Sequence, residues 1–188
     1  PVFWLMHLSI VLSIIVAFFA CAALTLYRFR GRKPIMVFVL AIQMTSGGII
    51  PQIIIYNQLG LLNKYSGLIL AYIAMVLPFA IWNMRGFFLN IPKDIFESAA
   101  VEGANDWQIL WKITFPLMRP MTLLVILLGS ISAFQSFDLV YTMTGGGPGR
   151  STTMTAMVYL YLYSFKYSKI GFAMAIGNVL ILVIAVLT

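Results

Sequence analysis

Few residues of this chain could carry out catalytic chemistry, and their spacing does not form a catalytic site. The chain has one histidine, His7, and one cysteine, Cys21, which lies within an apolar run. With a single histidine, a catalytic triad or a proton relay would be hard to assemble. No HExxH or GxSxG signature is present, nor is a Cys/His spacing typical of a metal site. We therefore predict that the chain is not an enzyme by itself and holds no catalytic residue, metal or cofactor.

The glycine-rich segment 144–150 resembles a phosphate-binding loop only superficially. Its sequence is Thr-Gly-Gly-Gly-Pro-Gly-Arg. A Walker A loop closes with Gly-Lys-Ser or Gly-Lys-Thr and follows a hydrophobic strand, and this segment does neither. A flexible turn is the better interpretation, so we predict no ATPase motif in the chain.

The five acidic residues are unevenly distributed, since four of them lie in a polar island at about residues 90–116, between two long apolar runs. Pro92 suits the first turn of a helix, where its missing N–H would have no partner. Asp94 and Glu97 follow where negative charge complements the positive end of the helix dipole. The island therefore predicts a short helix that begins outside the bilayer.

Small residues follow at a spacing of four, in the pairs Ala99 with Gly103 and Ala100 with Ala104. Residues four apart share one face of a helix, so the spacing predicts a face that another protein surface can approach closely. Gly103 is predicted to end the first helix, and Asn105 is a good N-cap for a second one toward Pro116. The island is thus predicted to be two short helices joined by a glycine elbow.

The run Glu97-Ser98-Ala99-Ala100, then Gly103, Ile113 and Phe115-Pro116, resembles the EAA loop of binding-protein-dependent ABC importer permeases. Ser98 interrupts the Glu-Ala-Ala run, and Phe115 replaces the usual leucine before proline. In that family the loop is a coupling helix that docks into a groove on a separate ATP-hydrolysing subunit. The resemblance implies that the ATPase-coupling residues are Glu97, Ala99, Ala100, Gly103, Ala104 and Pro116. The alternative interpretation is an amphipathic helix that rests on the membrane surface.

The composition is that of an integral membrane protein. Hydrophobic residues make up 62% of the 188 residues, charged residues make up 9%, and the mean hydropathy is +0.99. Several bilayer-spanning helices of about 20 residues account for this, whereas no soluble domain of this size needs so much apolar surface. The net charge of +7 does not indicate nucleic-acid binding, because the basic residues cluster at the ends of apolar runs.

The apolar runs predict an all-α, polytopic fold with about five transmembrane helices in one permease domain, residues 1–188, expected to be a fragment of a longer protein. The predicted spans are about 3–27, 34–56, 66–84, 120–140 and 170–188. A coupling loop at about 90–116 and an outer loop at 141–168, with a re-entrant or interfacial helix, connect them. Four cations directly follow the first span and place its C-terminal end in the cytoplasm. They are Arg28, Arg30, Arg32 and Lys33.

Other segments resemble the carbohydrate, maltose-type branch of the same family. Residues 28–33 and 59–63 resemble one of its two unlike permeases, whereas 137–148 and 159–175 resemble the other. Residues from about 20 to 118 therefore look like one partner and those from about 134 to 178 like the other. Whether the permease pairs with an unlike subunit or with itself is left open.

The resemblance implies a permease subunit that forms the translocation pathway for a sugar or oligosaccharide. Its implied partners are a dimeric ABC ATPase that binds ATP and Mg²⁺, a second permease, an extracytoplasmic solute-binding protein and the lipid bilayer, with no nucleic acid. The expected location is multi-pass in the bacterial or archaeal cytoplasmic (inner) membrane.

A sugar pathway needs neutral hydrogen-bonding groups and aromatic faces. The candidate pathway residues are Gln43, Asn83, Gln135, Asp138, Tyr141 and Asn178. Each could equally make an interhelical hydrogen bond, which averages about 0.6 kcal/mol in membranes. For Asp138, a structural hydrogen bond to the following loop is the favoured role.

Two other classes of protein fit parts of the sequence. A secondary transporter or channel working without ATP would explain the glycine- and proline-interrupted stretch 45–51, since broken helices are common in such proteins. Internal repeats and coupling-ion carboxylates, which such proteins generally carry, are missing. A membrane anchor or scaffold is the third option, in which the EAA-like loop would have no role.

Overall fold

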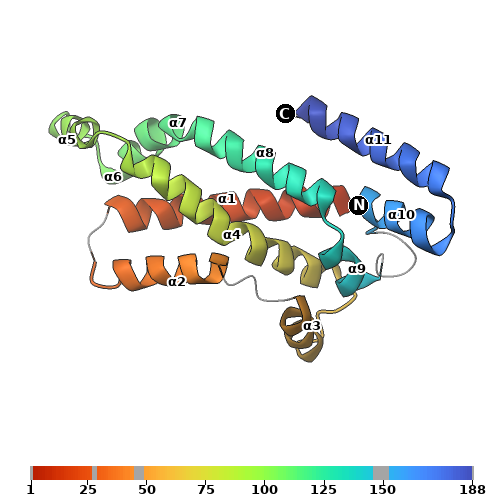
Figure 1. The fold of residues 1–188 in the computed structure, drawn as a ribbon. Coiled ribbons are helices and arrows are strands. Elements are labelled where there is room, and N and C mark those ends of the chain that lie inside the picture. Colours follow the sequence, from red (N-terminus) through yellow and green to blue (C-terminus); the bar gives the residue numbers. More distant parts are fainter. Residues whose placement is uncertain (1, 27–28, 45–48, 146–152, 188) are drawn as a thin grey trace. The chain divides into compact units, whose positions relative to one another are not determined.

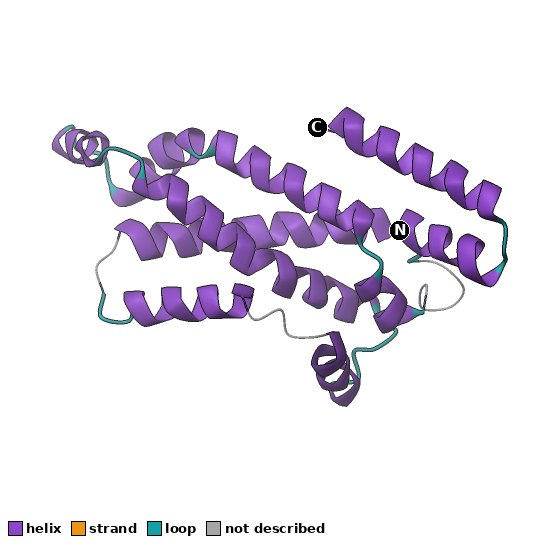
Figure 2. Ribbon diagram, in the orientation of Figure 1, coloured by secondary structure: helices purple, strands orange, loops and turns teal. Residues whose placement is uncertain are grey.

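The structure is a computed structural model that describes residues 2–26, 29–44, 49–145 and 153–187. These residues form helices and no strand, as Figure 2 shows, so the predicted all-α fold is confirmed. Three predicted features fall outside the described residues: Arg28 of the basic cluster, the interruption at 45–48 and most of the glycine-rich segment, 146–150.

Figure 1 labels the helices in chain order. They are α1 (Val2–Leu26), α2 (Arg32–Met44), α3 (Ile49–Gln58), α4 (Tyr65–Leu89), α5 (Lys93–Val101), α6 (Asp106–Gln108), α7 (Phe115–Leu117), α8 (Arg119–Gln135), α9 (Asp138–Thr144), α10 (Ala156–Tyr161) and α11 (Ile170–Leu187). Two π-helical segments lie between them, η1 (Ile109–Thr114) and η2 (Leu162–Lys166).

Two of the described helices are long and apolar enough to cross a membrane by themselves, α1 over Phe3–Thr25 and α4. Counting each of two bent helix pairs as one span gives up to four: α2 with α3, and Asp106–Leu117 with α8, which is bent by 60°. A shorter apolar helix covers Ile170–Val186. The protein is therefore a helical membrane protein, and its five-span topology stays a prediction.

Helix α4 runs past the predicted span 66–84, through Arg85 to Leu89. Basic residues at the membrane border do not end a helix, because the hydrogen bonds of its backbone form in water as well as in lipid. The helix ends only where the amides of Asn90 and Ile91 bond back by three residues, to Phe87 and Phe88. The coupling loop therefore begins with the cap of α5, three residues later.

The predicted span 120–140 is not one helix, since α8 ends at Gln135 and α9 begins at Asp138. Ser136, at the break, is held by side chains from elsewhere in the chain. Its hydroxyl accepts a hydrogen bond from the Tyr72 hydroxyl at 2.7 Å, and its carbonyl accepts one from Thr155 at 2.8 Å. These bonds supply partners for polar groups that a helix break would leave unsatisfied.

The chain divides into two compact units. Unit 1 contains residues 1–11, 46–74 and 127–188, and unit 2 contains residues 12–45 and 75–126. Helices α1, α4 and α8 each contribute residues to both units.

Unit 1 includes a hairpin whose first arm is the continuous helix of α10 and η2 and whose second arm is α11. Thr155 is the N-cap of α10, with its hydroxyl accepting from the Val158 amide at 3.3 Å. Tyr163 packs on Phe172 with ring centroids 4.6 Å apart, which joins the two arms. The short helix predicted in the outer loop is therefore present, over residues 156–166.

The core of unit 2 is built on a close approach of α1 and α4. Ala17 and Cys21 on α1 are fully buried, as is Ala80 on α4. The Cys21 thiol donates a hydrogen bond to the Ile81 carbonyl at 3.1 Å. Small residues allow membrane helices this closeness. The polar island at residues 90–116 packs on this pair of helices, with Phe115 beside Phe18 of α1 and Phe18 beside Phe88 of α4.

Candidate functional site

The first helix of the polar island, α5, begins at Lys93, with Pro92 as its N-cap rather than in its first turn. Asp94 lies in the first turn, as predicted. Ala99 is only 7% exposed and faces the protein, whereas Glu97 and Ala100 are exposed. The helix therefore presents its acidic and polar side chains outward.

The prediction that small residues line one face of this helix is wrong for Gly103 and Ala104. Helix α5 ends at Val101, and Glu102 is its C-cap, so both residues lie outside the helix. Their backbone amides instead close its end. The Gly103 amide donates to the Ala100 carbonyl at 3.1 Å, and the Ala104 amide donates to the Ala99 carbonyl at 3.0 Å. This pair of bonds is the Schellman arrangement of a helix C-terminus.

Gly103 ends the helix, as predicted, because of its backbone conformation. Its φ is +86°, in the left-handed region that side chains other than glycine rarely adopt. A Cβ atom added there would meet nothing within 4 Å. The requirement for glycine at this position is therefore conformational and not one of space.

Asn105 starts the second helix, also as predicted. Its side-chain oxygen accepts from the Gln108 amide at 2.8 Å, and its own amide donates to the Gln108 side chain at 2.9 Å. This reciprocal pair is a capping box. Only Ala104 separates the two closed helix ends, so few backbone groups in the elbow lack a partner.

The second helix is continuous from α6 through η1 to α7, but its middle is π-helical. The Phe115 amide bonds to the Leu110 carbonyl, five residues back, and the Thr114 hydroxyl bonds to the Ile109 carbonyl at 3.2 Å. Pro116 follows directly, in the first turn of α7. Proline has no N–H and clashes with the carbonyl four residues before it, so a widened turn at this point relieves both problems.

An aromatic ladder, which the sequence analysis missed, ties the second helix to α1. Its rungs are Trp107, Trp111 and Phe115, four residues apart, with successive ring centroids at 5.7 and 5.4 Å. On α1, Phe18 lies 5.7 Å from Phe115, and Phe19 lies 6.3 Å from Trp111. Phe18 also lies 6.0 Å from Phe88 of α4. The four-residue spacing of large aromatics was a readable signal.

The outward surface of α5 is a shallow acidic cup of about 360 Å³, lined by Asp94, Glu97, Ser98, Val101 and Glu102. Val101 is 88% exposed at this surface. An exposed apolar side chain ringed by carboxylates suits contact with a protein surface that offers an apolar hollow and a basic rim. Val101 and Glu102 were not among the predicted coupling residues.

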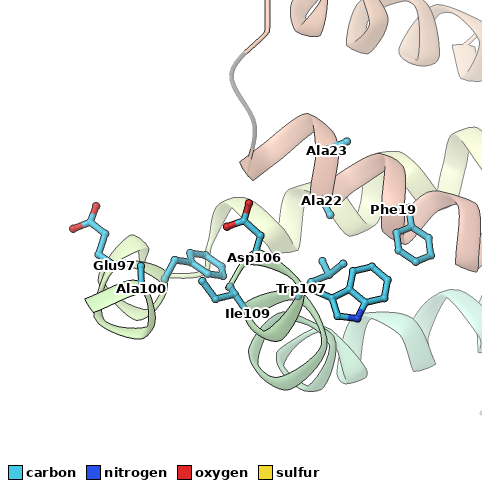
Figure 3. A pocket seen from close by; sticks show the side chains of 10 residues that line it. Phe19, Ala22, Ala23, Glu97, Ala100, Asp106, Trp107 and Ile109 are labelled. Carbon is cyan, nitrogen blue, oxygen red and sulfur yellow. The ribbon is translucent and has the colours of Figure 1, made fainter. Parts of the chain in front are cut away.

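Behind α5 lies a larger pocket of about 630 Å³, shown in Figure 3. Phe19, Ala22 and Ala23 of α1 line one side of it, and Trp107, Ile109 and Leu110 line another. Glu97 and Ala100 belong to its α5 wall. A pocket therefore lies between α5 and α1, and α5 contacts η1.

The predicted pathway residues do not form one group. Gln43 and Asn83 belong to unit 2, and Asn83 donates to the Phe79 carbonyl of its own helix at 2.8 Å. The Gln43 side-chain oxygen is buried with no partner among the described residues. Asn178 is exposed on α11. The local bond of Asn83 favours a structural role for that residue.

The remaining three candidates lie on either side of the break between α8 and α9, in unit 1. Gln135 and Asp138 are exposed, and Tyr141 stacks on Phe137 with ring centroids 5.2 Å apart. Tyr161 of α10 completes an aromatic cluster, at 4.9 Å from Phe137 and 5.4 Å from Tyr141. The hydrogen bond predicted from Asp138 to the following loop stays a prediction, because residues 146–152 of that loop lie outside the described residues.

His7 is packed as expected for a histidine near the outer end of a span. Its Nδ1 lies 2.8 Å from the Phe3 carbonyl, and its ring lies 3.9 Å from that of Phe3. Its Nε2 is 3.4 Å from the Ser130 hydroxyl. These contacts give the ring a structural role.

The structure is thus a helical membrane domain in which a two-helix elbow lies between apolar helices. Residues 5–188 match the family described as "Binding-protein-dependent transport system inner membrane component", and the chain belongs to that family. The resemblance inferred from the EAA-like loop is therefore confirmed at the level of the family.

The relatives include permeases of carbohydrate systems. The diacetylchitobiose uptake permease NgcG of Streptomyces coelicolor is 28% identical over 70% of this chain and 44% of its own length. The galactooligosaccharide transport permease GanQ of Bacillus subtilis is 32% identical over 70% and 47%, respectively. A crystal structure of a bacterial ABC transporter involved in import of the acidic polysaccharide alginate matches with a TM-score of 0.63. That match is 27% identical and covers 87% of this chain and 59% of the other. The chain spans less than half the length of these curated relatives.

Proposed function

We propose that this chain is the transmembrane permease subunit of an ABC importer for a sugar or oligosaccharide. The observation that carries the proposal is the elbow at Gly103 and Asn105, in which the EAA-like loop of a member of this family folds as two helices with both facing ends capped. The carbohydrate systems to which relatives belong support the substrate class.

The proposed partners are a dimeric ATPase that binds ATP and Mg²⁺, a second permease and an extracytoplasmic solute-binding protein. The acidic cup on α5 would dock into the ATPase, with Val101 in an apolar hollow and the carboxylates against basic residues. The chain would be multi-pass in the cytoplasmic membrane of a bacterium or archaeon, with the coupling loop in the cytoplasm. Helices α1 and α4 provide two of its spans.

In the proposed mechanism, the ATPase subunits move α5, and the elbow passes the movement to the second helix. The closed helix ends at Gly103 and Asn105 resist bending, so α5 and the second helix turn together. The aromatic ladder then transmits the force to Phe18 and Phe19 on α1. The open pocket behind α5 allows this route to carry most of the movement.

The proposed sugar contact is the aromatic cluster of Phe137, Tyr141 and Tyr161, with Gln135 and Asp138 beside it. Aromatic faces pack against the apolar faces of sugar rings, and polar side chains at the edge can bond hydroxyl groups. Tyr161 is 36% exposed, so part of the cluster is open to a ligand. Of the six predicted pathway residues, Asn83 is the weakest, because its amide is already bonded within α4.

The test is a cross-link from the acidic cup. In a Cys21→Ala background, Val101→Cys is combined with an ATPase subunit that carries one cysteine in its docking groove. A cross-link that changes with nucleotide is expected, because Val101 is 88% exposed. The matched control is Ala99→Cys, on the same helix but 7% exposed, which should react poorly.

Absence of the Val101 cross-link in properly inserted protein would count against the coupling proposal. Uptake into proteoliposomes would then distinguish the alternatives. Uptake driven by an ion gradient without ATP would identify a secondary transporter or channel instead.

A further inference from the structure

A second cavity of about 420 Å³ lies at the start of α5, within unit 2, and shares only Glu97 with the acidic cup. Its polar wall contains Thr25 of α1, Arg32 of α2 and Lys93 and Glu97 of α5. Its apolar wall includes Leu89 of α4 and Phe96 of α5. Segments distant in the sequence therefore bring two cations together beside an apolar surface.

The cations on this wall are not neutralised by the protein. Neither Arg32 nor Lys93 forms an ion pair with a carboxylate among the described residues, and Glu97 is one negative charge against two positive ones. Both cations are the first residues of helices, α2 and α5, whose N-terminal ends add partial positive charge. The α5 N-terminus also has no side-chain cap, since its N-cap is Pro92. The wall is therefore suited to an anion with several acceptor oxygens.

A buried hydroxyl without a partner marks the same cavity. The Thr25 oxygen is buried and has no hydrogen-bond partner among the described residues. A buried hydroxyl left unpaired is unfavourable, and a polar ligand in the cavity would satisfy it.

The location of the cavity indicates which kind of anion it would bind. It lies where the apolar helices α1 and α4 end, at Leu26 and Leu89, and the proposed topology, on which this inference rests, puts those ends at the cytoplasmic membrane surface. A small free anion gains nothing from Leu89 and Phe96, whereas a phospholipid brings a phosphate for the cations and carbon chains for the apolar wall. Basic pockets between membrane helices on the cytoplasmic side bind anionic headgroups.

We propose that this cavity binds the phosphate headgroup of an anionic phospholipid, which joins the N-terminus of α5 to α1 and α2. The bound lipid would hold the first coupling helix at the membrane surface from the end opposite the elbow. Anionic lipid would thereby favour productive coupling between ATP hydrolysis and uptake.

The test measures lipid binding to the complete importer by native mass spectrometry, with phosphatidylglycerol and with phosphatidylcholine as probes. Arg32→Gln and Lys93→Gln should each weaken phosphatidylglycerol binding about fivefold, the equivalent of about 1 kcal/mol per cation near the surface. The double variant should lose more than tenfold, with phosphatidylcholine unchanged. Thr25→Val, which keeps the side-chain volume, should also weaken phosphatidylglycerol binding.

Lys33→Gln is the matched control, since Lys33 neighbours Arg32 in sequence but does not line the cavity. An equal loss in Lys33→Gln would mean general surface attraction and overturn the proposal. Unchanged binding in the double variant would also overturn it, and displacement of the lipid by millimolar inorganic phosphate would identify a small-anion site. ATP-driven uptake by the unaltered importer in vesicles that contain phosphatidylglycerol tests the proposed transport function separately, because lipid binding is measured by mass spectrometry without transport.

Discussion

Replacing Gly103 with proline removes two features that keep the elbow closed. These are the positive φ of residue 103 and its backbone amide. Gly103 has a φ of +86°, whereas proline is fixed near −65°. Proline also lacks the amide that bonds to the Ala100 carbonyl, and the changed backbone direction would break the neighbouring bond from Ala104 to Ala99. The variant therefore loses the whole C-terminal closure of α5.

The magnitude follows from the two lost bonds. A net contribution of about 0.5–1.5 kcal/mol for each gives about 1–3 kcal/mol in total. Since about 1.4 kcal/mol is a factor of ten, the closed elbow should become about five- to 150-fold less favoured. We expect uptake to fall by at least that lower factor and ATP hydrolysis to lose its dependence on sugar.

The assay is sugar uptake and ATP hydrolysis in proteoliposomes that contain the complete importer. The matched variant is Gly103→Asn, since asparagine tolerates the left-handed region and keeps its amide. It should retain uptake within about twofold, because asparagine adopts a positive φ at little cost and an added Cβ meets nothing within 4 Å. Normal uptake in Gly103→Pro would refute the proposed transmission of movement through the elbow. Equal loss in Gly103→Asn would show that the left-handed backbone is not what matters.

Three further substitutions, two of them paired with a control variant, test other parts of the proposed mechanism. Asn105→Ala removes the capping box, worth about 1 kcal/mol, so uptake should fall by about fivefold, with insertion measured as a control. Trp111→Ala removes the aromatic contact between the second helix and α1, so uptake should fall while ATP hydrolysis continues. The control Trp111→Phe keeps an aromatic ring there and should retain most of the uptake and of the ATP hydrolysis. Tyr141→Ala should abolish sugar-stimulated ATP hydrolysis in an assembled complex, while Asn83→Ala should have little effect because its amide bonds only within α4.

The elbow was predictable because its signals are local. Gly103 and Asn105 act on backbone groups within five residues, and the structure has both caps where the sequence places them. The prediction of a small-residue face was wrong for a reason that is equally local. Once Gly103 adopts a positive φ, the helix has ended, so a four-residue spacing across it no longer describes one face.

The break between α8 and α9 was not predictable from local sequence. The run from 120 to 140 is apolar enough for a continuous span, and the interruption depends on Ser136 bonding to Tyr72 and Thr155. Those partners are 64 and 19 residues away in the chain. The aromatic cluster around Tyr141 depends in the same way on Tyr161 of α10, so Tyr141 was found as a candidate and its companion was not.

The structure gives the two alanines of the EAA-like motif different physical roles. Ala99 is 7% exposed, so a larger side chain would meet the protein, while Ala100 is exposed and lines the pocket behind α5. Both carbonyls accept the amides that close the helix, at Ala104 and Gly103. The spacing from the alanines to the glycine is therefore the spacing of a helix C-cap. In the proposed mechanism, a rigid end at this point would let a force on the acidic cup turn the second helix, because a frayed end would absorb the movement before it reached Trp111 and α1.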